Sequence, residues 1–283
     1  CFVIDWPEDQ LKYVIGMDVV PDERPIVHPA IAFLIPPQSV NTYKNLDDAE
    51  PGPGYTCFGS PGGGGFNQQW LGAWAPGALP SIDEARGIAV LPGSAVVLQM
   101  HYHPMDDPPA DQTKLRLKLA DSVDVPLYVV PFTNPDWLGG SMQIPAGEPR
   151  AVHQFEVDLT SFIGDFFPSA GVKNGDPFVI HELSLHMHTR GTRASIELDR
   201  QGAADECGLY IPDWDFSWQG GYTLEQPMTV NPGDRLRLAC EWDNSAANQP
   251  IVDGVPIDPV DIFWGEGTGD EMCLALLTIS PVQ

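Results

Sequence analysis

The sequence predicts an all-β protein made of two antiparallel β-sandwiches, and three observations support this fold class. The 29 prolines and 28 glycines interrupt the chain of 283 residues every few positions, which leaves few stretches with the period of a helix. The apolar segments between these interruptions have the length of strands. The hydrophobic content of 43% is enough for real cores, and the length suits one large or two ordinary domains.

In the first half of the chain, we expect four strands separated by turn residues. One of them ends at Pro36 and Pro37, and another, rich in β-branched residues, ends at Pro104. A third alternates polar and apolar residues, as a half-buried strand does. In chain order, these predicted strands cover residues 14–20, 26–35, 95–103 and 114–120.

The second half has the same pattern of short apolar segments, with a turn-rich stretch at 134–150. The predicted strands there cover residues 129–130, 155–159, 178–188, 194–198, 235–242 and 274–279. This second block of strands begins near residue 123, and no repeat of fixed period is visible. We therefore expect two domains, 1–122 and 123–283, each of them a β-sandwich.

Charge and hydropathy argue against two classes of partner. With 14 basic and 39 acidic residues, the net charge is −25, which disfavours nucleic acid and anionic membrane surfaces. The excess of carboxylates is typical of a solvated acidic surface, and an acidic patch for a cationic substrate or partner stays open as the alternative. No apolar run reaches the roughly 18–20 residues of a membrane-spanning helix.

The five cysteines, at positions 1, 57, 207, 240 and 273, indicate the redox compartment. They contain no C-x-x-C spacing, so they do not form a zinc pattern. Two disulfides and one remaining thiol would suit a secreted or periplasmic protein. Five free thiols in a cytosolic protein are the alternative that the spacing leaves open.

The pattern with the clearest chemical meaning is a pair of histidines at one strand and a methionine far along the chain. On a strand, side chains alternate between faces, so His186 and His188 project from the same face and can share a metal ion. Met272, in an Asp-Glu-Met-Cys sequence, offers a soft thioether that favours Cu(I). Two imidazoles and a thioether suit a copper ion that changes oxidation state, although each residue taken alone also fits a structural role.

The first half holds a second set of candidate metal ligands. His101 and His103 have the same H-x-H spacing, and His28 precedes an apolar strand with Pro29 beside it. Buried, hydrogen-bonded histidines are the alternative for this set. The chain has no Gly-x-Ser-x-Gly, P-loop or H-E-x-x-H sequence, so these patterns indicate no other catalytic class.

A series of short motifs along nearly the whole chain resembles a known family and follows the order that the motifs have in that family. The motifs are Val27-His28-Pro29-Ala30, Tyr55-Thr56-Cys57-Phe58-Gly59, Leu98-Gln99-Met100-His101-Tyr102, Ile144-Pro145-Ala146-Gly147-Glu148, His186-Met187-His188 before Arg190-Gly191, Cys240 before Asp243-Asn244, and Asp270-Glu271-Met272-Cys273. Together they resemble the copper type II, ascorbate-dependent monooxygenases, the group of peptidylglycine α-hydroxylating monooxygenase and dopamine β-monooxygenase, and above all their bacterial relatives.

This resemblance implies two jelly-roll-like β-sandwich domains that each hold one copper. It places the catalytic copper on His186, His188 and Met272 in the second domain. It implies a reaction in which O2 hydroxylates a substrate C–H bond while an ascorbate-like reductant supplies electrons. A non-catalytic or single-copper binding protein on the same fold is the alternative. The resemblance also implies the disulfides Cys1–Cys57 and Cys240–Cys273, with Cys207 left over.

The resemblance is incomplete at the first-domain copper, for which the family uses three histidines. Two of these fall on His28 and His101, but Pro29 stands in the place of the third. Three alternatives stay open: His103 supplies the missing nitrogen, the copper binds to two histidines, or the site is empty and the protein holds one copper.

A second departure concerns the substrate. The peptide-amidating enzyme holds a peptide carboxylate with an arginine, an asparagine and a tyrosine, and the matching positions here are Ser184, Leu274 and Leu276. None of these side chains can bind a carboxylate strongly, which argues against peptide amidation. We expect instead a small neutral or apolar substrate.

Overall fold

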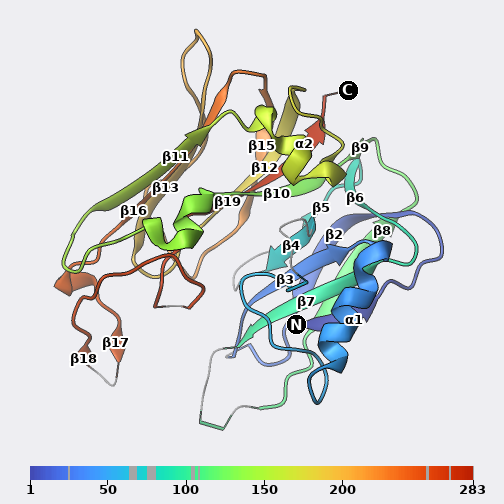
Figure 1. Cartoon of the computed structure of the whole chain (residues 1–283), viewed down its shortest axis with the longest axis horizontal. Coiled ribbons are helices and arrows are strands. Elements are labelled where there is room, and N and C mark those ends of the chain that lie inside the picture. The colour runs from blue at the N-terminus through green and yellow to red at the C-terminus, as the bar shows by residue number, and fades with distance from the viewer. Residues whose placement is uncertain are drawn as a thin grey trace. The chain divides into compact units, whose positions relative to one another are not determined.

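The computed structural model describes residues 1–24, 26–63, 69–74, 81–102, 106–107, 109–252, 255–267 and 269–282. It confirms the all-β fold class, because strands arranged in several sheets dominate both parts of the chain (Figure 1). The chain divides into two compact units, Cys1–Val130 and Pro131–Gln283. This division falls after the junction expected near residue 122, because β9 (Val125–Pro126) pairs with β6 (Arg86–Val90) inside the first unit.

The first unit contains two sheets. One has the strand order β1 (Phe2–Asp5), β7 (Ala95–Tyr102), β3 (Val27–Ile35), β4 (Gln69–Trp74). The other has the order β5 (Ser81–Ile82), β2 (Lys12–Val20), β6, β9, with β8 (Lys114–Ala120) also paired to β2. The β6–β9 pair is parallel, which departs from the antiparallel pairing that the sequence predicts.

The sheet that contains β3 and β7 is buried on both faces. Ala32, Leu34 and their neighbours belong to the core shared with the other sheet, whereas Phe33 and Ile35 pack on the opposite side. There they meet α1 (Val40–Asp48), a helix that follows the turn η1 (Pro37–Ser39) and that the sequence analysis did not predict (Figure 1). Cys1 and Cys57 lie in the same cluster and form the expected disulfide.

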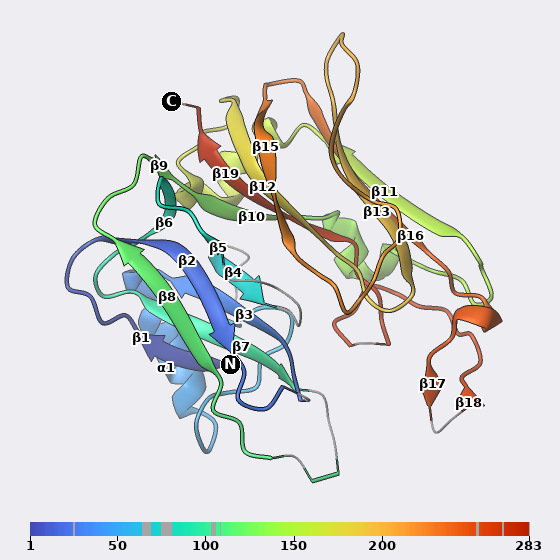
Figure 2. The ribbon, with the colours of Figure 1, turned by 180° about the vertical axis from the view of Figure 1, so that it is seen from behind.

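The second unit also pairs two four-stranded sheets, which are best followed in Figure 2. The first has the order β10 (Tyr128–Phe132), β19 (Leu274–Pro281), β12 (Phe178–His186), β15 (Gly221–Val230). The second has the order β11 (Ala151–Val157), β16 (Arg235–Trp242), β13 (Gly191–Asp199), β14 (Glu206–Ile211). The shorter elements are η2 (Trp137–Ser141), η3 (Leu159–Ser161), α2 (Ile163–Phe166), η4 (Pro168–Ala170), η5 (Ala246–Asn248), β17 (Ile251–Val252) and β18 (Val255–Pro256).

Side chains alternate between the core and the outer face along the strands of this unit. Leu183 and Leu185 of β12 are buried, whereas the alternate residues Ser184 and His186 are half-buried. Such alternation is typical of a strand with one face on the core. His186 of β12 therefore lies on the outer face of the sheet formed by β10, β19, β12 and β15.

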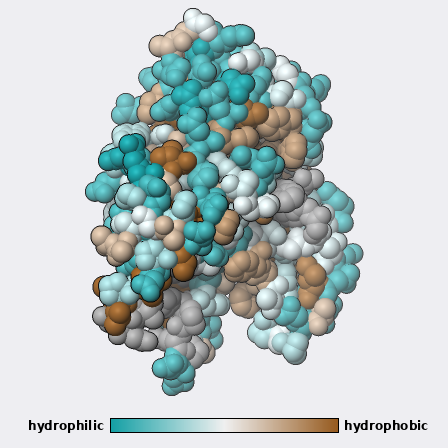
Figure 3. Space-filling view, turned by 60° about the vertical axis from the view of Figure 1, so that its left-hand side comes forward, coloured by the Kyte–Doolittle hydropathy of each residue, from teal (hydrophilic) through white to brown (hydrophobic). Residues whose placement is uncertain are grey.

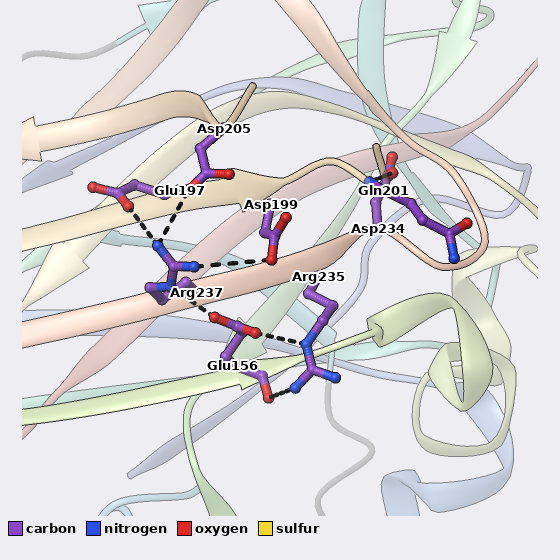
Figure 4. Close-up of polar contacts among 8 residues, drawn as sticks. All are labelled: Glu156, Glu197, Asp199, Gln201, Asp205, Asp234, Arg235 and Arg237. Carbon is purple, nitrogen blue, oxygen red and sulfur yellow. Dashed lines mark hydrogen bonds and ion pairs between the residues drawn. The ribbon is translucent and has the colours of Figure 1, made fainter. Parts of the chain in front are cut away.

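The outer face of the other sheet is occupied by ion pairs. Arg237 lies among Glu156, Glu197 and Asp199 of the adjacent strands and Asp205 just before β14, with N–O distances of 2.7 to 4.0 Å (Figure 4). Arg235 also pairs with Glu156, at 2.6 Å. Ion pairs at a partly exposed surface contribute little individually, about 0–1 kcal/mol each. This face is therefore a solvated, charge-paired surface.

One face of the molecule shows how much of its surface is polar. In Figure 3, hydrophilic residues cover most of the visible face, and hydrophobic residues form scattered patches. Among the described residues, no helix has both the length and the apolar character needed to cross a membrane.

Candidate metal centre

The two histidines of the second unit lie where β12 ends. His186 is the last residue of β12 and pairs with Leu274, the first residue of β19. When this antiparallel register is continued by two residues, His188 comes opposite Met272. Cross-strand partners share a face of the sheet, so the register directs the side chains of His186, His188 and Met272 to the same outer face.

Contacts beyond the paired strands support this continued register. The backbone N–H of His188 donates to Oε2 of Glu271 at 2.8 Å, and Nδ1 of His188 lies 3.0 Å from the carbonyl oxygen of Asp270. His188 is 5% exposed and Met272 is 9% exposed, so both lie below the surface. The two residues before Met272 thus hold His188 in place.

The two imidazole rings are close enough to share one ion. Their centres are 5.1 Å apart, and their planes are inclined by 79°. With metal–nitrogen bonds of about 2 Å, each ring centre would lie roughly 3 Å from the metal, so this separation allows joint coordination. Phe216, from the segment between β14 and β15, packs edge-on against His188 with a centroid distance of 6.0 Å.

The hydrogen bonds at Nδ1 determine the tautomer of both rings. Nε2 of Gln219 donates to the carbonyl of Phe216 at 2.8 Å, which directs Oε1 of Gln219 to Nδ1 of His186 at 2.6 Å. Oxygen atoms of amides and carbonyls only accept, so Nδ1 of His186 carries the proton. The carbonyl of Asp270 assigns the same tautomer to His188. In the neutral ring, Nε2 then carries the lone pair, and this arrangement is typical of metal-binding histidines.

Behind these residues lies a buried carboxylate. Glu271 is 0% exposed, and its oxygens accept from the backbone N–H of Arg190 at 2.7 Å, from that of His188, and from Nε1 of Trp242 at 2.9 Å. Burial raises the pKa of Glu271 to about 7, although the N–H donors and the nearby charge of Arg190 act in the opposite direction.

Arg190 links this carboxylate to several of the short sequence motifs described above. Its guanidinium donates to the carbonyl of Gly269 at 3.1 Å and to Oε1 of Gln249 at 3.2 Å. Gln249 in turn donates to Oδ1 of Asn244 at 2.9 Å, and Asn244 donates to the carbonyl of Pro145 at 2.9 Å. Burial lowers the pKa of Arg190, partly offset by the charges of Glu271 and Asp270. These motifs are therefore structural supports of one region.

The expected disulfide Cys240–Cys273 is present. Cys273 is 0% exposed and points into the core, whereas the neighbouring Met272 belongs to the outer face. Since Cys240 lies in β16 of the opposite sheet, the bond joins the two sheets directly behind the methionine. Cys207 is a free, exposed thiol.

The three positions that match the carboxylate-binding residues of the peptide-amidating enzyme share this face with His186. Ser184 pairs with Leu276, and His186 pairs with Leu274, so all four side chains lie on the outer side of β12 and β19. All are half-buried. The wall next to the imidazoles therefore presents one hydroxyl and two leucines, and its residues carry no charge.

The first-unit candidates are placed less completely. Val27 pairs with Tyr102 and Ala30 with Met100, so the backbone register has positions 28 and 29 opposite position 101 in a β-bulge. Proline lacks a backbone N–H, and a bulge is a position where a strand tolerates it. The strands thus bring positions 28 and 101 together, while His103 lies outside the described residues.

The thioether is essential to the proposed ligand set. Across the described ranges, His, Cys, Asp and Glu side chains form no group of three that could hold a metal.

The sequence has no local signal for Gln219 or for the role of Glu271, because their partners are 33 and 83 residues away.

Comparison with known proteins finds one family model that matches part of the chain and a distant relative. The model of "Copper type II ascorbate-dependent monooxygenase, C-terminal domain" matches residues 163–279, a range that includes His186, His188 and Met272. A chicken (Gallus gallus) protein described as "DBH-like monooxygenase protein 1" is 24% identical over 259 residues. The match covers 84% of this chain, which spans only 38% of that relative's length.

Among solved structures, the crystal structure of the infectious bursal disease virus VP2 subviral particle aligns with 95% of this chain and 58% of its own. The identity is 11% and the TM-score is 0.22, too low to support any argument about the fold or the function.

Proposed function

Because the chain belongs to the copper type II, ascorbate-dependent monooxygenase family, we propose that it is a copper-dependent monooxygenase. In this proposal, O2 and an external, ascorbate-like reductant are used to hydroxylate a C–H bond of a substrate. His186, His188 and Met272 would hold the catalytic copper. Copper bound there would supply the one-electron redox chemistry and the O2 activation that protein side chains lack.

The observation that best supports this proposal is the donor set at the end of β12. Both imidazoles have Nδ1 protonated, so each would bind copper through Nε2. Met272 comes opposite His188 when the register of β12 and β19 is continued by two residues, and it offers a sulfur that stabilises Cu(I). The buried contacts of Glu271, Asp270 and Gln219 hold these donors before any metal binds, which lowers the cost of forming the site.

The wall beside the imidazoles indicates the class of substrate. Ser184, Leu274 and Leu276 provide no cation for a peptide carboxylate, so we propose a neutral or apolar substrate and not a peptide for amidation. Because the three residues share the face of His186, an apolar group bound over the leucines would lie beside the copper ligands.

The proposed reaction needs a second electron, and its source separates the proposed function from its alternative. A first-unit copper on His28 and His101, with or without His103, would serve as an electron store. The bulge that places Pro29 opposite His101 favours the alternative, in which the chain holds a single copper and acts as a one-copper enzyme or as a copper-binding protein. The two disulfides fit an oxidising compartment, and we propose a secreted or periplasmic location.

The test measures copper content and O2 use on the full chain. The purified protein is loaded with copper, desalted and analysed for metal per chain, and O2 consumption is followed with ascorbate. Met272→Leu, which removes the sulfur at similar volume, should abolish reductant-dependent O2 consumption. Met228→Leu is the matched control, since Met228 is buried at 3% exposure on the core side of β15 and should leave O2 consumption unchanged.

Each outcome has a defined meaning. Two coppers per chain would support a coupled two-site enzyme, and one copper on the second unit would support the single-copper alternative. If the wild-type chain binds no copper in the second unit, the proposal is wrong.

A further inference from the structure

Two of the three ligand positions, His188 and Met272, lie beyond the last hydrogen-bonded pair of β12 and β19. The ladder between β12 and β19 ends at the pair His186–Leu274. His188 and Met272 are each two residues past that pair. Ladder hydrogen bonds therefore do not set the distance between the nitrogen of His188 and the sulfur of Met272, and another contact must do so.

Beyond the pair His186–Leu274, the carboxylate of Glu271 provides hydrogen bonds to the backbone in place of ladder hydrogen bonds. One oxygen accepts from the backbone N–H of Arg190 at 2.7 Å, and the other accepts from the backbone N–H of His188 at 2.8 Å. Glu271, the residue directly before Met272, thus binds both ends of the turn that follows β12. A carboxyl group is suited to this, because each of its two oxygens can accept from a different N–H group.

A third contact connects this arrangement to the opposite sheet. Nε1 of Trp242, at the end of β16, donates at 2.9 Å to the oxygen that also accepts from His188. The main chain of Glu271 is held as well, since its N–H donates to the carbonyl of Phe263 at 3.3 Å and its carbonyl accepts from Gly265 at 3.2 Å. Glu271 therefore has little freedom to move relative to either sheet.

We propose that Glu271 is a positioning residue that sets the distance between His188 and Met272 and so allows both to bind one copper. This inference rests on the proposed copper site. Glu271 is 0% exposed and, by strand alternation, belongs to the core side, so it acts through its neighbours and does not contact substrate.

Glu271→Gln is the most direct variant. Whichever way the glutamine amide turns, its NH2 group faces at least one N–H donor that the carboxylate accepted, so at least one backbone contact is lost. We expect the affinity for Cu(I) to fall about 10- to 100-fold, as for other outer-shell partners of metal ligands. We also expect the copper–sulfur scattering in X-ray absorption to weaken or disappear, whereas the copper–nitrogen scattering persists.

Asp234→Asn is the matched control for loss of a buried carboxylate. Asp234 is 6% exposed, and it accepts from the backbone N–H groups of Asn231 at 3.0 Å and Gln201 at 3.3 Å, far from the copper ligands in sequence (Figure 4). This variant should lower thermal stability as Glu271→Gln does, yet retain the wild-type Cu(I) affinity and copper–sulfur scattering. If Glu271→Gln retains both as well, the inference is wrong.

A measurement on the wild-type apoprotein covers the case in which Glu271→Gln does not fold. The amides of His188 and Arg190 should exchange with D2O as slowly as those of β12, although no ladder partner protects them. Exchange at the rate of an open turn would overturn the inference. A wild-type chain with protected amides but no copper–sulfur signal would instead contradict the proposed function and leave the structural contact intact.

Discussion

The ends of β12 and β7 carry the same H-x-H pattern, but the rest of the chain supports them differently. At β12, Gln219 and the carbonyl of Asp270 orient the two rings, and a buried carboxylate holds the turn that follows. At β7, the backbone register has positions 28 and 29 of the neighbouring strand opposite position 101, and the second of these is a proline.

This difference shows that an H-x-H spacing alone does not define a metal site. Strand alternation aligns two side chains, but a metal site also needs groups that fix ring orientation and ligand distance. At β12 these groups come from segments up to 83 residues away. We therefore treat the β12 end as the catalytic candidate. At the β7 end, a site completed by His103, a two-histidine site and an empty site stay the three alternatives, which metal analysis separates.

Removing one imidazole from each strand end should give the largest contrast. His188→Ala should abolish copper–sulfur scattering and reduce ascorbate-dependent O2 consumption by more than about 100-fold, because even outer-shell losses cost about 10–100-fold. His101→Ala should leave the second-unit copper in place. Metal analysis and X-ray absorption on both variants check this, and an equal loss of second-unit copper in the two would remove the distinction.

Altering the partner of His186 should have an intermediate effect. Gln219→Ala removes the acceptor of the Nδ1 proton, and we expect Cu(I) affinity to fall about 10-fold. Gln219→Glu retains an acceptor and should keep affinity close to that of the wild type. Competition with a Cu(I) chelator measures both values. Gln201→Ala, at an exposed turn, serves as the control, and an equal decrease there would count against a specific role for Gln219.

The smallest effect is expected on the charge-paired face of the other sheet. Arg237 and Arg235 lower the pKa of Glu156, chiefly through the hydrogen bond from Arg237. A lowered carboxyl pKa stabilises the fold above the unfolded pKa of about 4.3, and this stability is lost as the pH falls through the folded value. Arg237→Met should therefore be modestly destabilising at pH 7.

Urea unfolding from pH 7 down to pH 3 measures this change. The difference between Arg237→Met and the wild type should shrink toward acid pH, and copper content should stay unchanged throughout. A difference that is constant with pH would mean that packing of the arginine side chain, and not its charge, is responsible.

Local pattern was sufficient to predict much of the framework. The strands at 114–120 and 235–242 have the predicted bounds, because their alternation of polar and apolar residues is regular. The helix α1 was missed because only Val40 and Tyr43 of its residues are buried, which leaves a weak apolar stripe. The β6–β9 pair was missed because two-residue pairing has no sequence period.

For the site, the sequence alone identified the ligand candidates but not what holds them. His186 and His188 stand out by spacing, and Met272 by family resemblance. The contacts of Glu271 and Gln219 depend on how distant segments meet in space, and a buried glutamate has no pattern that distinguishes it from a surface one. Long-range contacts of this kind require coordinates.

The disulfide Cys240–Cys273 has a consequence for how the protein matures. Because Cys273 adjoins Met272, the proposed sulfur ligand, and Cys240 belongs to the opposite sheet, we expect thiol oxidation and assembly of the proposed site to be coupled. We expect chains folded under reducing conditions to load copper slowly or with incomplete coordination. Metal delivery would then come after oxidative folding, so that the oxidation history of the chain determines when its redox centre becomes active.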